Sequence, residues 1–178
     1  MNKILIIGLI LVIASCSDSP EDNENDGNKK EESSAVETNS KSKHYYSMYD
    51  LKGMVDQLNS SLPMEYDSVT ILNSVSAKEG RIIQYSYKVD MDAMLTGMGK
   101  ELNMSMASVK SMLNKQGGLE PFFKDYIKNE YGPEIVRDDC SNAPLVKLLN
   151  DSVSFHHYFY DLNSKFISKV VVLKEYCK

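Results

Sequence analysis

The hydrophobic and polar positions of residues 44–178 follow two different periods, one typical of helices and one typical of strands. The helical spacing i, i+3, i+4, i+7 occurs first, in Leu51, Met54, Val55 and Leu58. It predicts an amphipathic helix with this face towards the core. We expect the helix to end near Asn59, because Leu62 precedes Pro63 and is biased away from helical geometry.

A period of two then predicts a hairpin. Residues 68–76 are typical of a strand, with Val69, Ile71 and Val75 on one face, and residues 77–80 form a turn. In the return strand, 81–89, the apolar positions alternate strictly with polar ones and are Ile83, Tyr85, Tyr87 and Val89. Such alternation indicates a half-buried antiparallel strand.

The middle of the chain is helical in pattern. Residues 91–116 are rich in methionine and predict a helix that Gly97 and Gly99 divide into two pieces. A second apolar helical face follows in Phe122, Phe123, Tyr126 and Ile127, and we expect a break at Gly132-Pro133. A short helix capped by Ser141 or Asn142 should then run to residue 149.

The chain closes with a second predicted hairpin, formed by residues 153–160 and 165–176 around a turn at 161–164. In the last strand we expect Ile167, Val171 and Leu173 on one face and Phe166, Ser168 and Val172 on the other. The predicted order is therefore α-β-β, two or three helices, then β-β. It favours an α+β domain, a four-stranded antiparallel sheet from two hairpins with helices packed on one face.

The N-terminal residues differ from the rest of the chain. Lys3 is followed by an unbroken apolar run, residues 4–14. At about 1.5 Å per residue this run spans only about half of a ~30 Å hydrocarbon core, so it favours a cleaved signal peptide over a membrane-spanning helix. The run ends in Ile13-Ala14-Ser15-Cys16.

This ending resembles the lipobox of bacterial lipoproteins, an aliphatic residue and two small residues before a cysteine. The resemblance implies that residues 1–15 are removed and that Cys16 receives a diacylglyceryl group and N-terminal acylation, commonly palmitate. Two or more acyl chains hold a protein stably to a membrane. Ser17 stands where an Asp would favour the inner membrane, so the resemblance favours the outer membrane. The alternative is an ordinary signal peptide with a chance cysteine.

Composition divides the mature chain in two. Residues 17–43 contain almost no large apolar side chains and hold eight acidic and four basic residues, which predicts a disordered tether from Cys16 with a reach of roughly 30 Å. Residues 44–178 are expected to form a single domain. This domain holds seventeen acidic and fifteen basic residues, so its charge gives no reason to expect a nucleic-acid partner.

The two cysteines beyond Cys16 suggest a disulfide. An exported compartment permits one between Cys140 and Cys177, although two free thiols are the alternative. No motif around either cysteine provides a base for nucleophilic catalysis. His156-His157 is a weak zinc candidate, because neighbouring residues of a strand point to opposite faces. Asp138-Asp139 is more typical of a solvated or capping loop than of a cation site. We therefore expect no metal and no cofactor.

Tyrosines on the predicted strands are the main candidate for an interaction surface. Tyr85, Tyr87, Tyr158 and Tyr160 would form an aromatic surface for a peptide or ligand if they faced solvent, and would otherwise pack under the helices.

The domain also resembles small uncharacterised exported proteins of bacteria, in Leu62-Pro63-Met64, in residues 83–87 and in the hairpin that ends at Cys177. That resemblance implies an exported α+β fold without an activity. The function predicted is a lipid-anchored envelope lipoprotein that binds an envelope protein and is not an enzyme. An enzyme without a recognisable motif and a purely structural lipoprotein are the alternatives.

Overall fold

The computed structural model describes residues 45–178, so the predicted signal peptide, Cys16 and the tether lie outside the described residues. His44–Lys178 forms one compact unit. Its first helix, α1 (Met48–Asn59), begins at a capping box: the backbone N–H of Asp50 donates to Ser47 Oγ over 3.2 Å, and the Asp50 carboxylate accepts from the Ser47 N–H over 2.7 Å. Leu51 and Val55 of the predicted face are buried.

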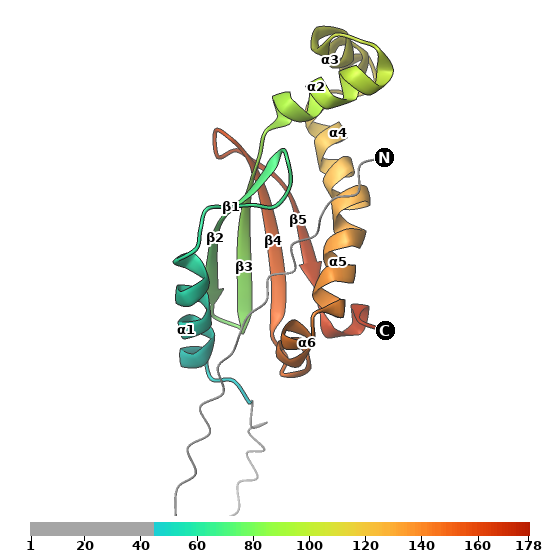
Figure 1. Cartoon of the computed structure of the whole chain (residues 1–178). Helices are drawn as coiled ribbons and strands as arrows, with labels where there is room; N and C mark the ends of the chain where they lie inside the picture. Colours follow the sequence, from blue (N-terminus) through green and yellow to red (C-terminus); the bar gives the residue numbers. More distant parts are fainter. Residues whose placement is uncertain (1–44) are drawn as a thin grey trace, which may run out of the picture. The chain divides into compact units, whose positions relative to one another are not determined.

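Five strands form one sheet in the order in which they occur along the chain (Figure 1). They are β1 (Met64–Glu65), β2 (Thr70–Lys78), β3 (Ile82–Val89), β4 (Ser154–Asp161) and β5 (Phe166–Val172). Neighbouring strands run antiparallel except β3 and β4, which run parallel with Tyr85 opposite His157.

The α+β class predicted from the sequence is confirmed, but the four-stranded antiparallel sheet is wrong in two respects. β1 has two residues, too few to give a period-two pattern. The two hairpins also meet through β3 and β4, and the long helical segment between them returns the chain so that β4 starts beside the start of β3. A parallel pair requires such a long crossover.

The helices between β3 and β4 are α2 (Met91–Leu102), α3 (Met106–Lys115), α4 (Leu119–Tyr126), a π-helical turn (Ile127–Tyr131), α5 (Gly132–Ser141) and α6 (Ala143–Asn150). A 3₁₀ turn (Lys174–Tyr176) follows β5. The predicted division of the methionine-rich helix is present, but it falls at Asn103, which adopts φ 53°, and not at the glycines. Gly99 instead allows a close backbone approach, since a Cβ there would lie 2.6 Å from the Met104 carbonyl oxygen.

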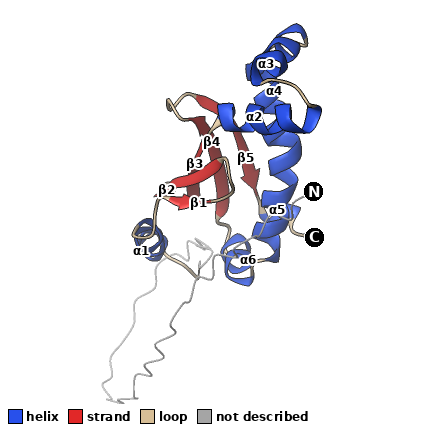
Figure 2. Cartoon of the chain, turned by 45° about the horizontal axis from the view of Figure 1, so that its top comes forward, coloured by secondary structure: helices blue, strands red, loops and turns tan. Residues whose placement is uncertain are grey.

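The predicted break at Gly132-Pro133 is wrong, because α4, the π turn and α5 form one continuous rod (Figure 2). The Gly132 N–H donates to the Ile127 carbonyl, five residues back. The wider π turn ends where α5 begins, so Pro133 lies in the first turn of α5, where a missing N–H costs little. The rod buries Phe123, Ile127, Tyr131 and Ile135.

Two β-bulges change which side chains reach the core. The bulge between Leu72 and Ser74 buries both Leu72 and Val75 and leaves Ile71 38% exposed, so Ile71 and Val75 do not share a face. The register between β4 and β5 shifts in the same way between Phe159 and Tyr160 of β4. As a result the alternation of faces is broken in β5, where the neighbours Ile167 and Ser168 are both buried. Each bulge inserts one residue and so reverses the expected alternation.

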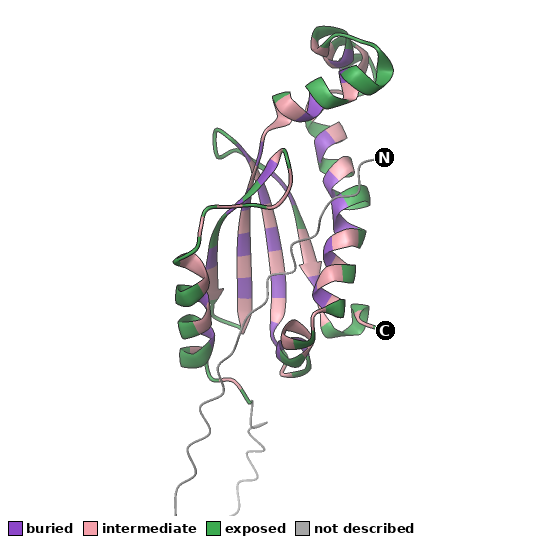
Figure 3. Ribbon diagram, viewed as in Figure 1, coloured by how far each residue is buried: buried purple, intermediate pink, exposed green. Residues whose placement is uncertain are grey.

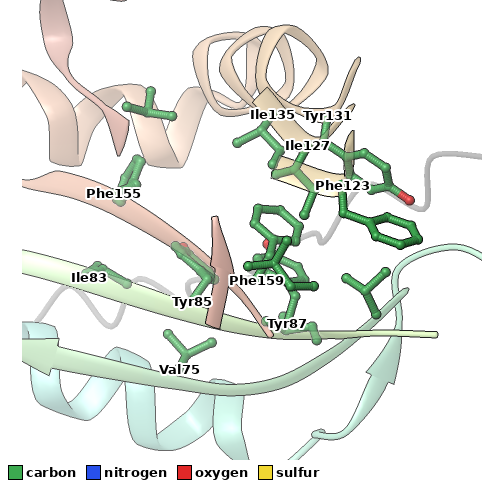
Figure 4. Close-up of a cluster of buried hydrophobic side chains, with 14 of the residues drawn as sticks. Val75, Ile83, Tyr85, Tyr87, Phe123, Ile127, Tyr131, Ile135, Phe155 and Phe159 are labelled. Atoms are coloured by element: carbon green, nitrogen blue, oxygen red, sulfur yellow. The ribbon is translucent and has the colours of Figure 1, made fainter. Parts of the chain in front are cut away.

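The core lies between the rod and one face of β3 and β4. In Figure 3 the buried and half-buried residues alternate along both strands. Figure 4 shows the rod residues Phe123, Ile127 and Tyr131 on the side of the rod that faces the sheet, with Ile127 above Phe159. The rings of Tyr131 and Phe159 are 5.8 Å apart. Burial of these large aromatic side chains makes the main hydrophobic contribution to stability.

A side-chain amide completes the edge of β2 beyond the short strand β1. Asn59, the last residue of α1, accepts from the Val75 N–H over 2.9 Å and donates to the Val75 carbonyl over 2.8 Å. It thereby satisfies backbone groups that a neighbouring strand would otherwise pair. This contact fixes α1 alongside β2.

An ion-pair cluster joins the start of the described chain to two turns. The Asp151 carboxylate accepts from the Tyr45 and Tyr46 backbone N–H groups over 2.7 and 2.9 Å and pairs with the Arg81 guanidinium. Arg81 also donates to the Tyr46 carbonyl over 2.8 Å. We call these four residues the Asp151 clamp.

Candidate functional site: the open face of the sheet

The face of β3 and β4 turned away from the core is lined by alternate side chains. In register across the two strands, these are Gln84, Ser86, Lys88, His156, Tyr158 and Tyr160. All six are half-buried, and none belongs to the hydrophobic core. β5 extends this face with Phe166, Lys169 and Val171, which lie opposite Tyr160, Tyr158 and His156. We call this surface the open face.

Three aromatic rings on the open face form one cluster, the aromatic platform of Tyr158, Tyr160 and Phe166. Their ring centroids lie 5.9 to 6.5 Å apart, and the two tyrosine rings are stacked with an interplanar angle of 16°. Phe166 is 49% exposed. Aromatic side chains with one accessible face are enriched in protein interfaces.

Two lysines flank the platform. Lys88 Nζ lies 6.0 Å from the Tyr160 ring centroid, and Lys169 Nζ lies 5.9 Å from that of Tyr158. Lys88 is fixed in place, since it donates to the Asp161 carbonyl over 3.2 Å and to Ser164 Oγ over 2.5 Å. A partner that covers the platform would therefore meet aromatic carbon next to positive charge, an arrangement that favours aromatic or acidic side chains.

His156 lies next to the platform, with its ring centroid 6.4 Å from that of Tyr158. Partial burial lowers the pKa of His156, and the electrostatic effects of Lys169 and of the neighbouring His157 lower it further. A neutral imidazole can both donate and accept a hydrogen bond. At neutral pH His156 therefore adds a polar contact to the platform without adding to its charge.

The four tyrosines predicted to form one surface lie on opposite faces of the sheet. Tyr85 and Tyr87 are 8% and 4% exposed and belong to the core, whereas Tyr158 and Tyr160 are on the open face. The parallel register causes the division, because it places Tyr85 opposite His157 and Tyr158 opposite Ser86. The interaction surface is thus reduced to Tyr158 and Tyr160, and Phe166, Lys88 and Lys169 are additional members that the strand pattern did not single out.

The core face carries a polar chain that was not predicted. Asp139 Oδ2 lies 2.9 Å from His157 Nε2, and His157 Nδ1 lies 3.2 Å from the Tyr87 hydroxyl. Because a carboxylate only accepts, Nε2–H donates to Asp139, and in the corresponding neutral tautomer Nδ1 accepts from the Tyr87 hydroxyl. The Tyr85 ring stacks on the imidazole at 4.7 Å.

This Asp139–His157–Tyr87 chain resembles an acid–base relay in composition, but its members are all less than 9% exposed. Buried, mutually satisfied polar groups of this kind fix the packing of a core. Asp139 stands four and eight residues after Ile135 and Tyr131, which is the one signal in the sequence that places it on the core side of α5. His157 reaches the core and His156 the open face, as expected for neighbours on a strand.

The predicted disulfide between Cys140 and Cys177 is present, with 5.0 Å between the two Cα atoms. It links the last turn of α5 to the C-terminal 3₁₀ turn and encloses α6, β4 and β5. Among residues 45–178, no group of three or more His, Cys, Asp or Glu side chains is placed to hold a metal ion. None of the helices in that part of the chain has the length and apolar character that crossing a membrane requires.

Three buried tyrosines and the half-buried Tyr66 should make the fold sensitive to alkaline pH. Burial raises the pKa of Tyr66, Tyr85, Tyr87 and Tyr131. A nearby carboxylate raises the pKa of two of them further, Asp138 for Tyr66 and Asp67 for Tyr131. A raised folded-state pKa means that stability is complete below the unfolded-state value of about 10 and falls as pH rises above it. We expect the urea midpoint to fall steeply between about pH 10 and 11.

The Tyr85→Phe variant tests this dependence, because it removes one hydroxyl and keeps the ring. We expect the slope of unfolding free energy against pH above about 10 to decrease by up to about 1.4 kcal/mol per pH unit. Tyr49→Phe, at a ring that is 85% exposed, is the matched control and should leave the slope unchanged. Equal slopes for the wild type and Tyr85→Phe would contradict the prediction.

Comparisons with known proteins give a distant likeness of fold. No protein-family model matches the sequence, and no curated protein matches it. The pilotin EpsS of the Vibrio vulnificus type 2 secretion system is 15% identical over 71% of this chain and 87% of its own, with a TM-score of 0.46. The Vibrio cholerae type II secretion pilotin AspS is 16% identical over the same shares, with a TM-score of 0.42.

A candidate secreted protein of Pseudomonas aeruginosa is 13% identical over 73% of this chain and 95% of its own, also with a TM-score of 0.42. Likenesses at these identities and TM-scores carry no argument about function. The chemistry of the open face therefore remains the basis for a functional conclusion.

Proposed function

We propose that this chain is a lipoprotein of the bacterial cell envelope that is anchored through lipid on Cys16 and binds an envelope protein through the aromatic platform. The observation that carries the binding role is the cluster of the half-buried Tyr158 and Tyr160 with the exposed Phe166, between two lysines on the open face. A soluble domain rarely exposes a contiguous aromatic cluster unless a partner covers it.

The anchor and the platform act together in this proposal. The lipobox-like residues 13–16 support attachment to a membrane, and Ser17 supports the outer membrane over the inner one. The polar residues 17–43 provide a tether of roughly 30 Å, over which the domain would search for its partner. Confinement near a membrane raises the effective concentration of a partner in the same membrane, so a single modest interface would be sufficient.

Affinity purification of the lipidated protein from gently solubilised envelopes tests the proposal. We expect one protein to be recovered near 1:1 with the wild type and at least about tenfold less with the Tyr158→Ser, Tyr160→Ser, Phe166→Ser variant, because hot-spot aromatics contribute about 2 kcal/mol or more each. The three residues lie outside the core, so the variant should keep its urea midpoint.

The matched control replaces exposed apolar residues elsewhere, as Tyr45→Ser, Tyr49→Ser and Leu162→Ser. It should recover the partner as the wild type does. Equal recovery by the platform variant would contradict the binding role. A Cys16→Ser variant that stayed in the membrane fraction would contradict the anchor.

A further inference from the structure

The outer edge of the sheet at β5 is unusually accessible for strand pairing. Within residues 45–178, β4 is the single strand that pairs with β5. Every second backbone N–H and C=O of an edge strand points away from its neighbour. In the described part of the chain, no side chain or turn donates to or accepts from those groups of Phe166–Val172, in contrast to the β2 edge, which Asn59 completes.

A hollow of about 530 Å³ runs along this edge. Its lining residues, which define the β5 groove, are Lys128, Gly132, Pro133, Val136, Lys169, Val170 and Val171. One wall is three consecutive residues of the edge strand, and the other is the outer side of the helical rod. Figure 1 shows β5 and α5 side by side.

The helical wall is long enough to lie beside a short strand. Lys128, Gly132 and Val136 follow at intervals of four residues, so they form one line along the rod. Eight helical residues rise about 12 Å, the length of three to four residues of an extended chain. The π turn contributes Lys128 to this line and ends at Gly132, and π turns often occur at functional positions.

Gly132 sets the width of the groove. It has no side chain where the rod comes closest to β5, and a Cβ placed there would lie 3.7 Å from Val170 Cγ2, an ordinary contact distance. The space is therefore compatible with an alanine, yet the sequence leaves it open. α4, the π turn and α5 all contact β5, so the rod runs beside the edge strand where a sixth strand would add.

The side chains of the groove indicate what would bind there. The lining contains two lysines and no acidic residue, and its remaining members are valine, proline and glycine. Lys169 on the edge strand also opposes pairing with a second copy, because two β5 edges would bring like charges together. An acidic segment with apolar residues at alternate positions would meet no such repulsion.

We propose that the β5 groove receives an extended, acidic segment of a partner protein, which adds to the sheet as a sixth strand beside β5. Backbone hydrogen bonds to β5 provide affinity, and Lys128 and Lys169 select acidic side chains. Phe166 and Lys169 belong to β5, so the added strand extends the same open face that carries the platform. This inference rests on the proposed function only in taking the partner to be a protein.

The test is a titration of the ¹⁵N-labelled chain, residues 16–178 with Cys16→Ser, followed by NMR. The probes are a capped nine-residue peptide of alternating Glu and Val, its Lys and Val counterpart, and the Glu and Val peptide with alternate backbone nitrogens methylated. We expect the acidic peptide to shift the amide signals of Lys169, Val170 and Val171 and to bind at least tenfold more tightly than either of the other two.

Two variants locate the site. Lys128→Glu should weaken binding of the acidic peptide about tenfold, and Gly132→Ala should weaken it by narrowing the groove without a clash. Lys147→Glu, the same charge change at an exposed position of α6, is the control and should bind as the wild type does.

The inference would be overturned if the acidic and basic peptides bound equally, or if methylation or Lys128→Glu left binding of the acidic peptide unchanged. It would also be overturned if no peptide bound at millimolar concentration, or if the protein alone sedimented with twice its monomer mass. The platform variant separates this result from the proposed function. If the platform variant loses the envelope partner but still binds the peptide, the defect lies in the platform alone. If it keeps the envelope partner but no longer binds the peptide, the defect lies in the β5 groove.

Discussion

Reduction of the Cys140–Cys177 disulfide is expected to lower the free energy of unfolding by about 4 kcal/mol. The bond closes a loop with a sequence separation of 37 residues, and the chain-entropy model gives about 4 kcal/mol for a loop of this length. That is a large part of the 5–15 kcal/mol typical of a domain. Urea unfolding of the Cys16→Ser chain with and without reductant measures it, and the midpoint should fall by roughly 2 M.

A variant without the bond controls for side effects of the reductant. The Cys140→Ser, Cys177→Ser chain should unfold at the midpoint of the reduced wild type, and reductant should not change it further. A wild-type midpoint that does not respond to reductant would show that the enclosed segment, from α6 to β5, is held by its packing alone.

Replacement of Asp139 by alanine is expected to cost about 3 kcal/mol. The substitution leaves the buried Nε2–H of His157 without its acceptor, and an unsatisfied buried polar group costs about 1–3 kcal/mol, or more if the ring is charged. The urea midpoint at pH 7 measures the loss. Asp138→Ala is the matched control, since Asp138 is the adjacent residue and pairs with Arg137 at the surface. It should cost less than about 1 kcal/mol.

A double replacement distinguishes the cost of an orphaned group from a loss of packing. Asp139→Leu combined with His157→Phe removes both partners and keeps apolar volume, so it should destabilise the fold less than Asp139→Ala alone. If the double variant is the less stable of the two, the polar chain contributes net stability and does more than specify the packing.

The strands show where sequence reasoning succeeds and where it fails. The alternation of Ile83, Tyr85, Tyr87 and Val89 correctly identified the core face of β3, because that strand is regular throughout. The faces of Ile71 and Val171 were assigned wrongly, since a bulge lies on the paired strands in each case and no residue pattern marks its position. Period-two reasoning holds only as far as the register is continuous.

Longer-range features depended on contacts that the sequence does not display. The parallel pairing of β3 with β4 joins residues about 70 positions apart, and hairpin signals are local. The pair Gly132-Pro133 usually ends a helix, but a π turn placed the proline at the first turn of the next helix.

The candidate site was predicted in part. Tyr158 and Tyr160 were identified by residue type, but their separation from Tyr85 and Tyr87 follows from the strand register, which composition does not determine. Phe166 was seen as a strand residue only, and its exposure arises because β5 is the last strand of the sheet. The two cysteines were paired correctly because few alternatives existed.

The Asp151 clamp determines how mechanical load would enter the domain. If the chain is anchored as proposed, a pull from the membrane side would arrive at Tyr45 and Tyr46, whose backbone N–H groups are held by Asp151. Arg81 and Asp151 pass that force to the turn after β2 and to the segment before β4, so it is shared between two central parts of the sheet. Neither the free edge of β5 nor the aromatic platform includes a residue of the Asp151 clamp, so tension on Tyr45 and Tyr46 would not pull directly on the residues that contact a partner.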